Sequence, residues 1–134
     1  MRHKKSGRAL SRNAAHRRAL LRNLVTSLIM EGRIVTTDAK AKELRRYADR
    51  MITLGKERTL AARRRAREFV QTDVAVKRLF DEVAPRFSTR QGGYTRIIKL
   101  GTRHGDAAPC SIVELTELPA GGVGTSEGAR AEPA

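Results

Sequence analysis

Guanidinium and ammonium groups crowd the first 22 residues, and no Asp or Glu stands among them. Unpaired charges are costly to desolvate, so a compact domain cannot bury this segment. Free in solution it would repel itself and stay extended. We therefore expect residues 1–12 to form a basic arm that binds a dense polyanion; a solvated terminus or an organellar transit peptide are the alternatives. The basic residues are Arg2, Lys4, Lys5, Arg8, Arg12, Arg17, Arg18 and Arg22.

A second group of arginines lies at residues 63–67, where four of five positions are Arg. At helical spacing, Arg63, Arg64 and Arg67 fall opposite the apolar residues and Arg65 flanks them. The planar guanidinium donates two hydrogen bonds at once to a phosphate. The pattern predicts phosphate contact here, with an exposed helix face as the alternative. For the basic residues of segment 39–54, a solvated face and RNA contact are equally good interpretations.

Motifs for catalysis or metal binding are missing from the sequence. It contains no GxxxxGK[ST] loop, GxGxxG fingerprint, GxSxG elbow or HExxH pair. The histidines (His3, His16 and His104) and Cys110 do not have the spacing of zinc ligands. We therefore expect a protein that is not an enzyme, with no catalytic residues, cofactor, metal or small-molecule substrate.

The composition favours nucleic acid as the partner. The chain has 134 residues and a formal net charge of +14, which suits one domain that binds a polyanion. A single cysteine excludes an internal disulfide and makes a reducing compartment the default. No apolar run approaches the ~20 residues of a membrane span. Zinc fingers and heptads are absent, so a folded RNA fits better than sequence-specific DNA recognition. With about eight phosphate contacts, the logarithm of the binding constant plotted against the logarithm of the salt concentration would have a slope of about −6 to −7.

The hydrophobic periodicity predicts an α+β fold of about four helices with a small mixed or antiparallel sheet. Ser11 is a plausible N-cap of the first helix, and Gly32 suits its C-terminal end. Pro85 is expected to end the fourth helix at Ala84. Residues 1–118 would be a single domain and 119–134 a disordered tail. The expected helices are residues 11 or 13 to 31, 39–54, 60–70 and 74–84. The expected strands are a short one near 33–36 and a hairpin of 94–100 and 111–115.

Several blocks of the sequence resemble the family of the bacterial large-subunit ribosomal protein numbered seventeen. They are MRHKKSGRALSR with HRRALLRNL, GRIVTTDAKAKELRRYAD at residues 32–49, LFDEVAPRF at 79–87, QGGYTRIIKLGTRHGDAAP at 91–109 and IVELTE at 112–117. The blocks stand in the family's order over residues 1–117, and together they are highly specific.

This resemblance implies a compact, non-catalytic domain bound to large-subunit ribosomal RNA in the cytoplasm. It also implies a place near the nascent-chain exit region, beside other ribosomal proteins and away from any membrane. By matching position, the resemblance implies that the RNA-facing residues are Arg2, His3, Lys4, Lys5, Gly7, Arg8, Arg12, His16, Arg17, Arg22, Lys40, Lys42, Arg96 and Arg103.

The chain also departs from the family. Ala14 and Ala15 stand where small hydroxyl residues are common, and His104 replaces a frequent arginine. Residues after Leu118 match no family block. A general, nucleoid-type nucleic-acid-binding protein remains the alternative function, and equal affinity for duplex DNA and folded ribosomal RNA would favour it.

Overall fold

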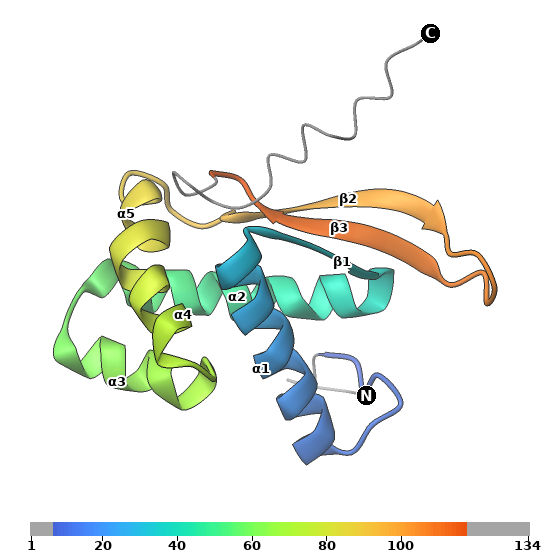
Figure 1. The fold of residues 1–134 in the computed structure, drawn as a ribbon, viewed down its shortest axis with the longest axis horizontal. Coiled ribbons are helices and arrows are strands. Elements are labelled where there is room, and N and C mark those ends of the chain that lie inside the picture. The colour runs from blue at the N-terminus through green and yellow to red at the C-terminus, as the bar shows by residue number, and fades with distance from the viewer. Residues whose placement is uncertain (1–6, 118–134) are drawn as a thin grey trace, which may run out of the picture.

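The computed structural model describes residues 7–117, which form helices on one side of a small sheet (Figure 1). The α+β class predicted from the sequence is confirmed. The expected tail and residues 1–6 of the arm lie outside the described range. In chain order the elements are α1 (Ala14–Glu31), β1 (Arg33–Thr37), α2 (Asp38–Glu57), α3 (Leu60–Phe69), α4 (Asp73–Arg78), the π-helical turn η1 (Leu79–Val83), α5 (Ala84–Arg86), β2 (Thr95–Thr102) and β3 (Pro109–Leu115).

Helix α1 begins at Ala14, two residues later than a cap at Ser11 would place its start. Asn13 is the N-cap, and its side chain accepts a hydrogen bond of 2.8 Å from the His16 backbone N–H. Ser11 has φ 55°, in the left-handed region, whereas an N-cap needs an extended backbone. The prediction of Ser11 as cap is therefore wrong. Gly32 ends the helix with φ 80° and donates to the Leu28 carbonyl, as predicted.

Threonine hydroxyl groups cap helices α3 and α4. The Thr59 hydroxyl accepts from the Ala62 N–H at 3.0 Å, and the Thr72 hydroxyl accepts from the Ala75 N–H at 3.2 Å. Each cap satisfies a backbone donor that the first helical turn cannot pair. Their short loops bring α3 and α4 into contact with each other.

Pro85 does not end the fourth helix, contrary to the prediction. Residues 79–83 form a π-helical turn in which Ala84 donates its backbone N–H to the Leu79 carbonyl, five residues back. The wider turn makes room where a regular α-helix would place the proline ring against a carbonyl. Helix α5 then carries Pro85 in its first turn, where the missing N–H breaks no bond.

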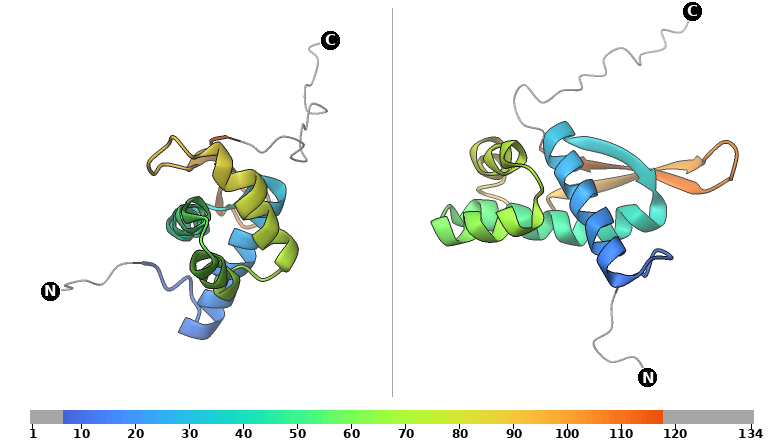
Figure 2. Two further views of the ribbon diagram at one scale, coloured as in Figure 1. Left: turned by 90° about the vertical axis from the view of Figure 1, so that its left-hand side faces the viewer. Right: turned by 60° about the horizontal axis from the view of Figure 1, so that its bottom comes forward.

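The three strands form an antiparallel sheet in the order β1-β3-β2. The short strand β1 joins the β2–β3 hairpin, and this settles the choice between a mixed and an antiparallel sheet. A bulge between Lys99 and Gly101 shifts the register of β2. Beyond the bulge, the hairpin extends past the helices (Figure 2).

The core lies between the helices and one face of the sheet. Helix α2 contacts all three strands, and α1 crosses near β1. Gly55 of α2 is buried, and a Cβ there would stand 2.7 Å from the Ala84 Cβ. This close crossing of α2 and α5 fixes where the α4–α5 segment lies against the long helix. Leu21, Leu44, Leu79, Phe87 and Val113 are among the fully buried side chains.

Candidate nucleic-acid interface

The described end of the basic arm lies over the first half of helix α2. Gly7, Arg8 and Arg17 line a hollow together with Glu43 and Arg46 of α2. Glu43 is only 8% exposed, and its carboxylate lies 4.0 Å from the Arg46 guanidinium. Arg8 and Arg17, predicted from separate arguments about the arm and the helix, are thus brought to one place.

The N-terminal half of α1 carries cations where the helix dipole favours anions. Its first turn holds no acidic residue, and His16, Arg17 and Arg18 stand in or next to that turn. Cations near the positive end of a helix dipole cost stability, typically about 0.3–1 kcal/mol each at an exposed site. An anion bound beside this turn would offset that repulsion. It would be attracted at once by the helix dipole, the guanidinium groups and the free backbone N–H groups.

Two predicted arginines of this region have partners within the protein. The Arg22 Nε donates to the Phe69 carbonyl at 2.8 Å, which ties α1 to the end of α3. Arg12 donates to the Leu10 carbonyl at 2.7 Å. Both side chains therefore shape the protein, whatever else they contact.

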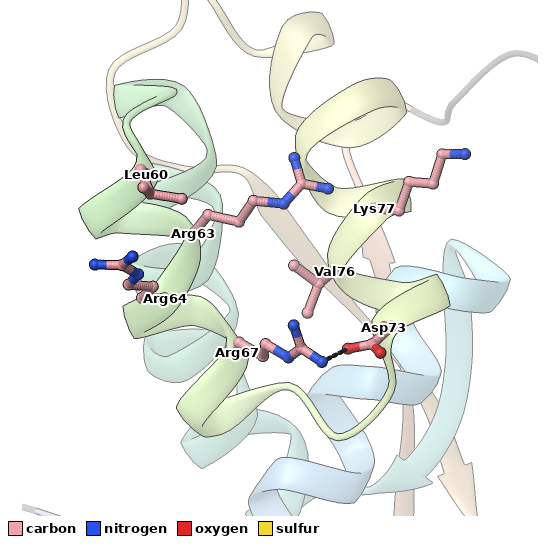
Figure 3. A pocket seen from close by; sticks show the side chains of 7 residues that line it. All are labelled: Leu60, Arg63, Arg64, Arg67, Asp73, Val76 and Lys77. Atoms are coloured by element: carbon pink, nitrogen blue, oxygen red, sulfur yellow. Dashed lines mark ion pairs between the residues drawn. The ribbon is translucent and has the colours of Figure 1, made fainter.

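A groove between α3 and α4 collects the second group of arginines (Figure 3). Arg63 and Arg67 extend from α3 toward α4, while the guanidinium of Arg64 points away from α4. Lys77 adds a fourth cation from α4. The helical spacing predicted that the arginines share a face, and the structure shows that this face borders a groove.

One carboxylate lines this groove, and it pairs with Arg67. The Arg67 Nη2 lies 2.7 Å from the Asp73 Oδ1, across two exposed side chains. The Arg63 guanidinium stands over the Phe80 ring at 5.4 Å. Within residues 7–117, neither Arg63 nor Arg64 has a carboxylate partner, so the groove keeps an excess of positive charge.

The predicted residues near the sheet lie apart from this groove. The Arg96 Nε donates to the Glu114 carboxylate at 2.7 Å, and Lys42 pairs with Asp38 at 3.3 Å. At the hairpin tip, Arg103 forms a two-pronged ion pair with Asp106, and this hydrogen bonding lowers the pKa of the Asp106 carboxyl and raises that of Arg103. Arg96 and Arg103 thus carry internal partners in addition to any external one.

Sequence reasoning missed Lys77 as a member of the α3–α4 groove, and it left open whether Arg46, in segment 39–54, contacts RNA or solvent. Lys77 stands in the last turn of a short helix, and Arg78 is its only basic neighbour in the chain. Its place opposite Arg63 depends on the packing of α3 against α4, which no local pattern reveals. Arg2, His3, Lys4 and Lys5 lie outside the described residues.

Residues 7–117 contain neither a metal-ligand cluster nor a membrane-spanning helix. No group of three or more His, Cys, Asp or Glu side chains is arranged to hold a metal ion. No helix in that range is long and apolar enough to cross a membrane.

The chain is similar to known proteins along most of its length. A family model described as ribosomal protein L17 matches residues 20–116. Relatives named large ribosomal subunit protein bL17 include that of Heliobacterium modesticaldum, 62% identical over 108 residues that cover 81% of this chain and 96% of the relative. The protein of Syntrophotalea carbinolica is 59% identical over 117 residues, covering 87% of this chain and 76% of the relative. The protein of Pelobacter propionicus is 56% identical over 117 residues, covering 87% and 92%.

Proposed function

The chain belongs to the ribosomal protein L17 family, and from this premise we propose that its basic grooves bind the folded RNA of the large ribosomal subunit. As a family member it is a structural constituent of that subunit and of the translation apparatus, and it is not an enzyme. It associates there with ribosomal RNA and other ribosomal proteins.

The α3–α4 groove carries this proposal. Three arginines and one lysine surround it, and one carboxylate offsets them. Phosphates that converge from separate strands of a folded RNA would match such a concave cluster, because each guanidinium can hold one phosphate in a two-pronged bond. The cationic first turn of α1 and the hollow beside Gly7 provide a second contact region, with the basic arm next to it in the chain.

The resemblance also supports a location near the nascent-chain exit region, beside other ribosomal proteins. We infer that Lys40, Lys42 and Arg103 also lie along the path of the RNA. A nucleoid-type protein would use the same charges to bind nucleic acid outside the ribosome. Membership of this family weighs against that role.

The direct test removes two cations from the groove. The variant Arg63→Gln/Arg64→Gln should bind large-subunit RNA more weakly. The slope of the logarithm of the binding constant against the logarithm of the salt concentration should become less steep by about 1.4 to 1.8, because two phosphate contacts are lost. Filter binding or fluorescence anisotropy of the full chain over a range of salt concentrations measures both quantities.

A matched control is available at two exposed arginines that do not line the groove. Arg86→Gln/Arg90→Gln removes the same charge from exposed residues, and Arg86 lines a hollow with Asp81 and Glu82. This control should keep the slope within about half a unit of the wild type. Equal losses in the two double variants would show that the groove has no special part in binding. Equal affinity of the wild type for duplex DNA would favour the nucleoid-type alternative.

A further inference from the structure

The face of the sheet turned away from the helices carries a row of aliphatic side chains. The register pairs Val35 with Ile112 and Ile112 with Ile98, so these three side chains lie side by side on one face. Val35 is 64% exposed and Ile98 39% exposed. Leu100, two residues further along β2 at the bulge, is 53% exposed.

The opposite face of the same strands is the one that the helices cover. There the register aligns Ile34, Val113 and Ile97, and Val113 is fully buried. None of the described helices covers the outer face (Figures 1 and 2). A sheet with one solvated face normally alternates apolar and polar residues. A row of aliphatics on that face instead indicates a surface that a partner covers.

The charges on the outer face make RNA a poor partner for it. Glu114 stands between Arg33 and Arg96 in the next row, and its carboxylate lies 3.5 Å from the Arg33 Nη2 and 2.7 Å from the Arg96 Nε. Both cations are thus already neutralised in part, and Glu114 would repel a phosphate. Aliphatic side chains neither hydrogen-bond nor stack with bases in the way that aromatic and arginine side chains do.

A second copy of the chain is also a poor partner. Each copy carries a net charge of +14, so self-association would bring two strongly basic molecules together. The family's place in the large subunit leaves the other ribosomal proteins as candidates.

We propose that the outer face of the sheet is a docking surface for another protein of the large subunit. The partner offers an aliphatic patch to Val35, Ile98 and Ile112, and a carboxylate at the rim beside Arg96, whose side chain is still 58% exposed. This inference rests on membership of the subunit and is independent of the RNA contacts proposed for the grooves.

The first test uses a substitution that would weaken binding of a protein partner to this face but not binding of RNA. Val35→Lys adds a cation, which leaves contact with RNA unharmed but places an unpaired ammonium group in an apolar contact. We expect this variant to compete about tenfold less well with the wild type for incorporation into large subunits. Val74→Lys, at an equally exposed valine (64%) on α4, should incorporate like the wild type. Incorporation of Val35→Lys at the wild-type level would overturn the proposal.

The second test reads coverage of the face directly and does not depend on that variant. In a Cys110→Ala background, which removes the only cysteine, Ile98→Cys reports accessibility through its rate of reaction with a maleimide. The thiol at position 98 should react equally fast in the free chain and in its complex with protein-free large-subunit RNA, and at least about tenfold more slowly in whole subunits.

Each other pattern of reactivity contradicts the docking surface. Protection on RNA alone would assign the face to RNA, and fast reaction in whole subunits would leave it uncovered. Protection in the free chain would place a second copy or another segment of this chain there. Failure of the free chain to bind RNA would refute the proposed RNA interface, while the reactivity in whole subunits would still decide the docking surface.

Discussion

Among single residues, Asp49 of α2 is the carboxyl group least suited to its surroundings. Its Oδ1 is buried and accepts no hydrogen bond within the described part of the chain. Burial raises the pKa of this carboxyl, and the nearby Arg45 offsets only part of that effect. The folded protein therefore holds the Asp49 proton more tightly than the unfolded chain does, and stability is lost as the pH rises through the folded pKa.

Asp49→Asn should remove this dependence. Relative to the variant, the wild type should lose stability as the pH rises from about 4, the ordinary pKa of Asp, toward neutrality, because only the wild type must ionise a desolvated carboxyl. Urea denaturation of both proteins at a series of pH values measures the difference in the free energy of unfolding.

Asp38 provides a control of opposite sign. A hydrogen bond from the Ser111 hydroxyl, 2.9 Å long, is the main cause that lowers the pKa of Asp38. The ionised Asp38 carboxylate contributes its stabilisation fully above the ordinary pKa of Asp, and this stabilisation is lost as the pH falls through the lowered pKa of Asp38. Asp38→Asn should therefore weaken the protein at neutral pH and converge with the wild type in acid. A shift of the same sign in both variants would contradict these environments.

For single residues, the sequence located the cations better than their partners. The arginines at 63, 64 and 67 do lie together on one side of α3, because helical spacing fixes that arrangement. The pairing of Arg67 with Asp73 and the anchoring of Arg22 to Phe69 depend on tertiary packing. No local pattern could therefore show which arginines already have an internal partner.

At the scale of elements, the crossing of α2 and α5 depends on the absence of a side chain. An alanine in place of a helical glycine usually stabilises a protein by about 1 kcal/mol. At Gly55 the added Cβ would stand 2.7 Å from the Ala84 Cβ, closer than real Cβ contacts allow. We expect Gly55→Ala to lower the free energy of unfolding by about 1–3 kcal/mol through overpacking.

A double-mutant cycle tests this account of the crossing. Ala84→Gly alone should destabilise, since it weakens the helix and leaves a gap. In the Gly55→Ala background the same change should cost less or restore stability, because it removes the clashing methyl group. Chemical denaturation of the four proteins gives the coupling energy. Strictly additive effects would show that the two helices do not meet as the structure places them.

The elements also show where sequence patterns reach their limit. Threonine caps and the left-handed Gly32 were predictable because each is a local requirement of a helix end. The π-helical turn before Pro85 was not, because a proline after a helical pattern indicates a helix end as readily as a wider turn that makes room for its ring. Helix α2 also runs past Leu54 to Glu57, and Arg58 ends it with φ 55°. The sequence offered no glycine at that position to mark the end.

At the scale of the whole molecule, the arm and the core should separate cleanly. Deletion of residues 2–12 keeps the Asn13 cap and the buried residues of α1, so the fold should remain intact. The deletion removes Arg2, Lys4, Lys5, Arg8 and Arg12. The dependence of RNA binding on salt, as the slope of log binding constant against log salt concentration, should become less steep by about 3.5 to 4.5. Circular dichroism and binding over a salt series measure the two effects. An unfolded truncated chain would refute the division into arm and core, and an unchanged slope would refute the role of the arm.

We propose that arginine clusters at defined places hold this protein on the RNA of the large subunit. Sedimentation of large subunits through sucrose gradients of increasing salt tests it most directly, with the wild type, Arg63→Gln/Arg64→Gln and the control Arg86→Gln/Arg90→Gln each incorporated. The groove variant should leave the subunit at a lower salt concentration than the other two proteins. If all three dissociate at the same salt concentration, the α3–α4 groove is not an RNA contact.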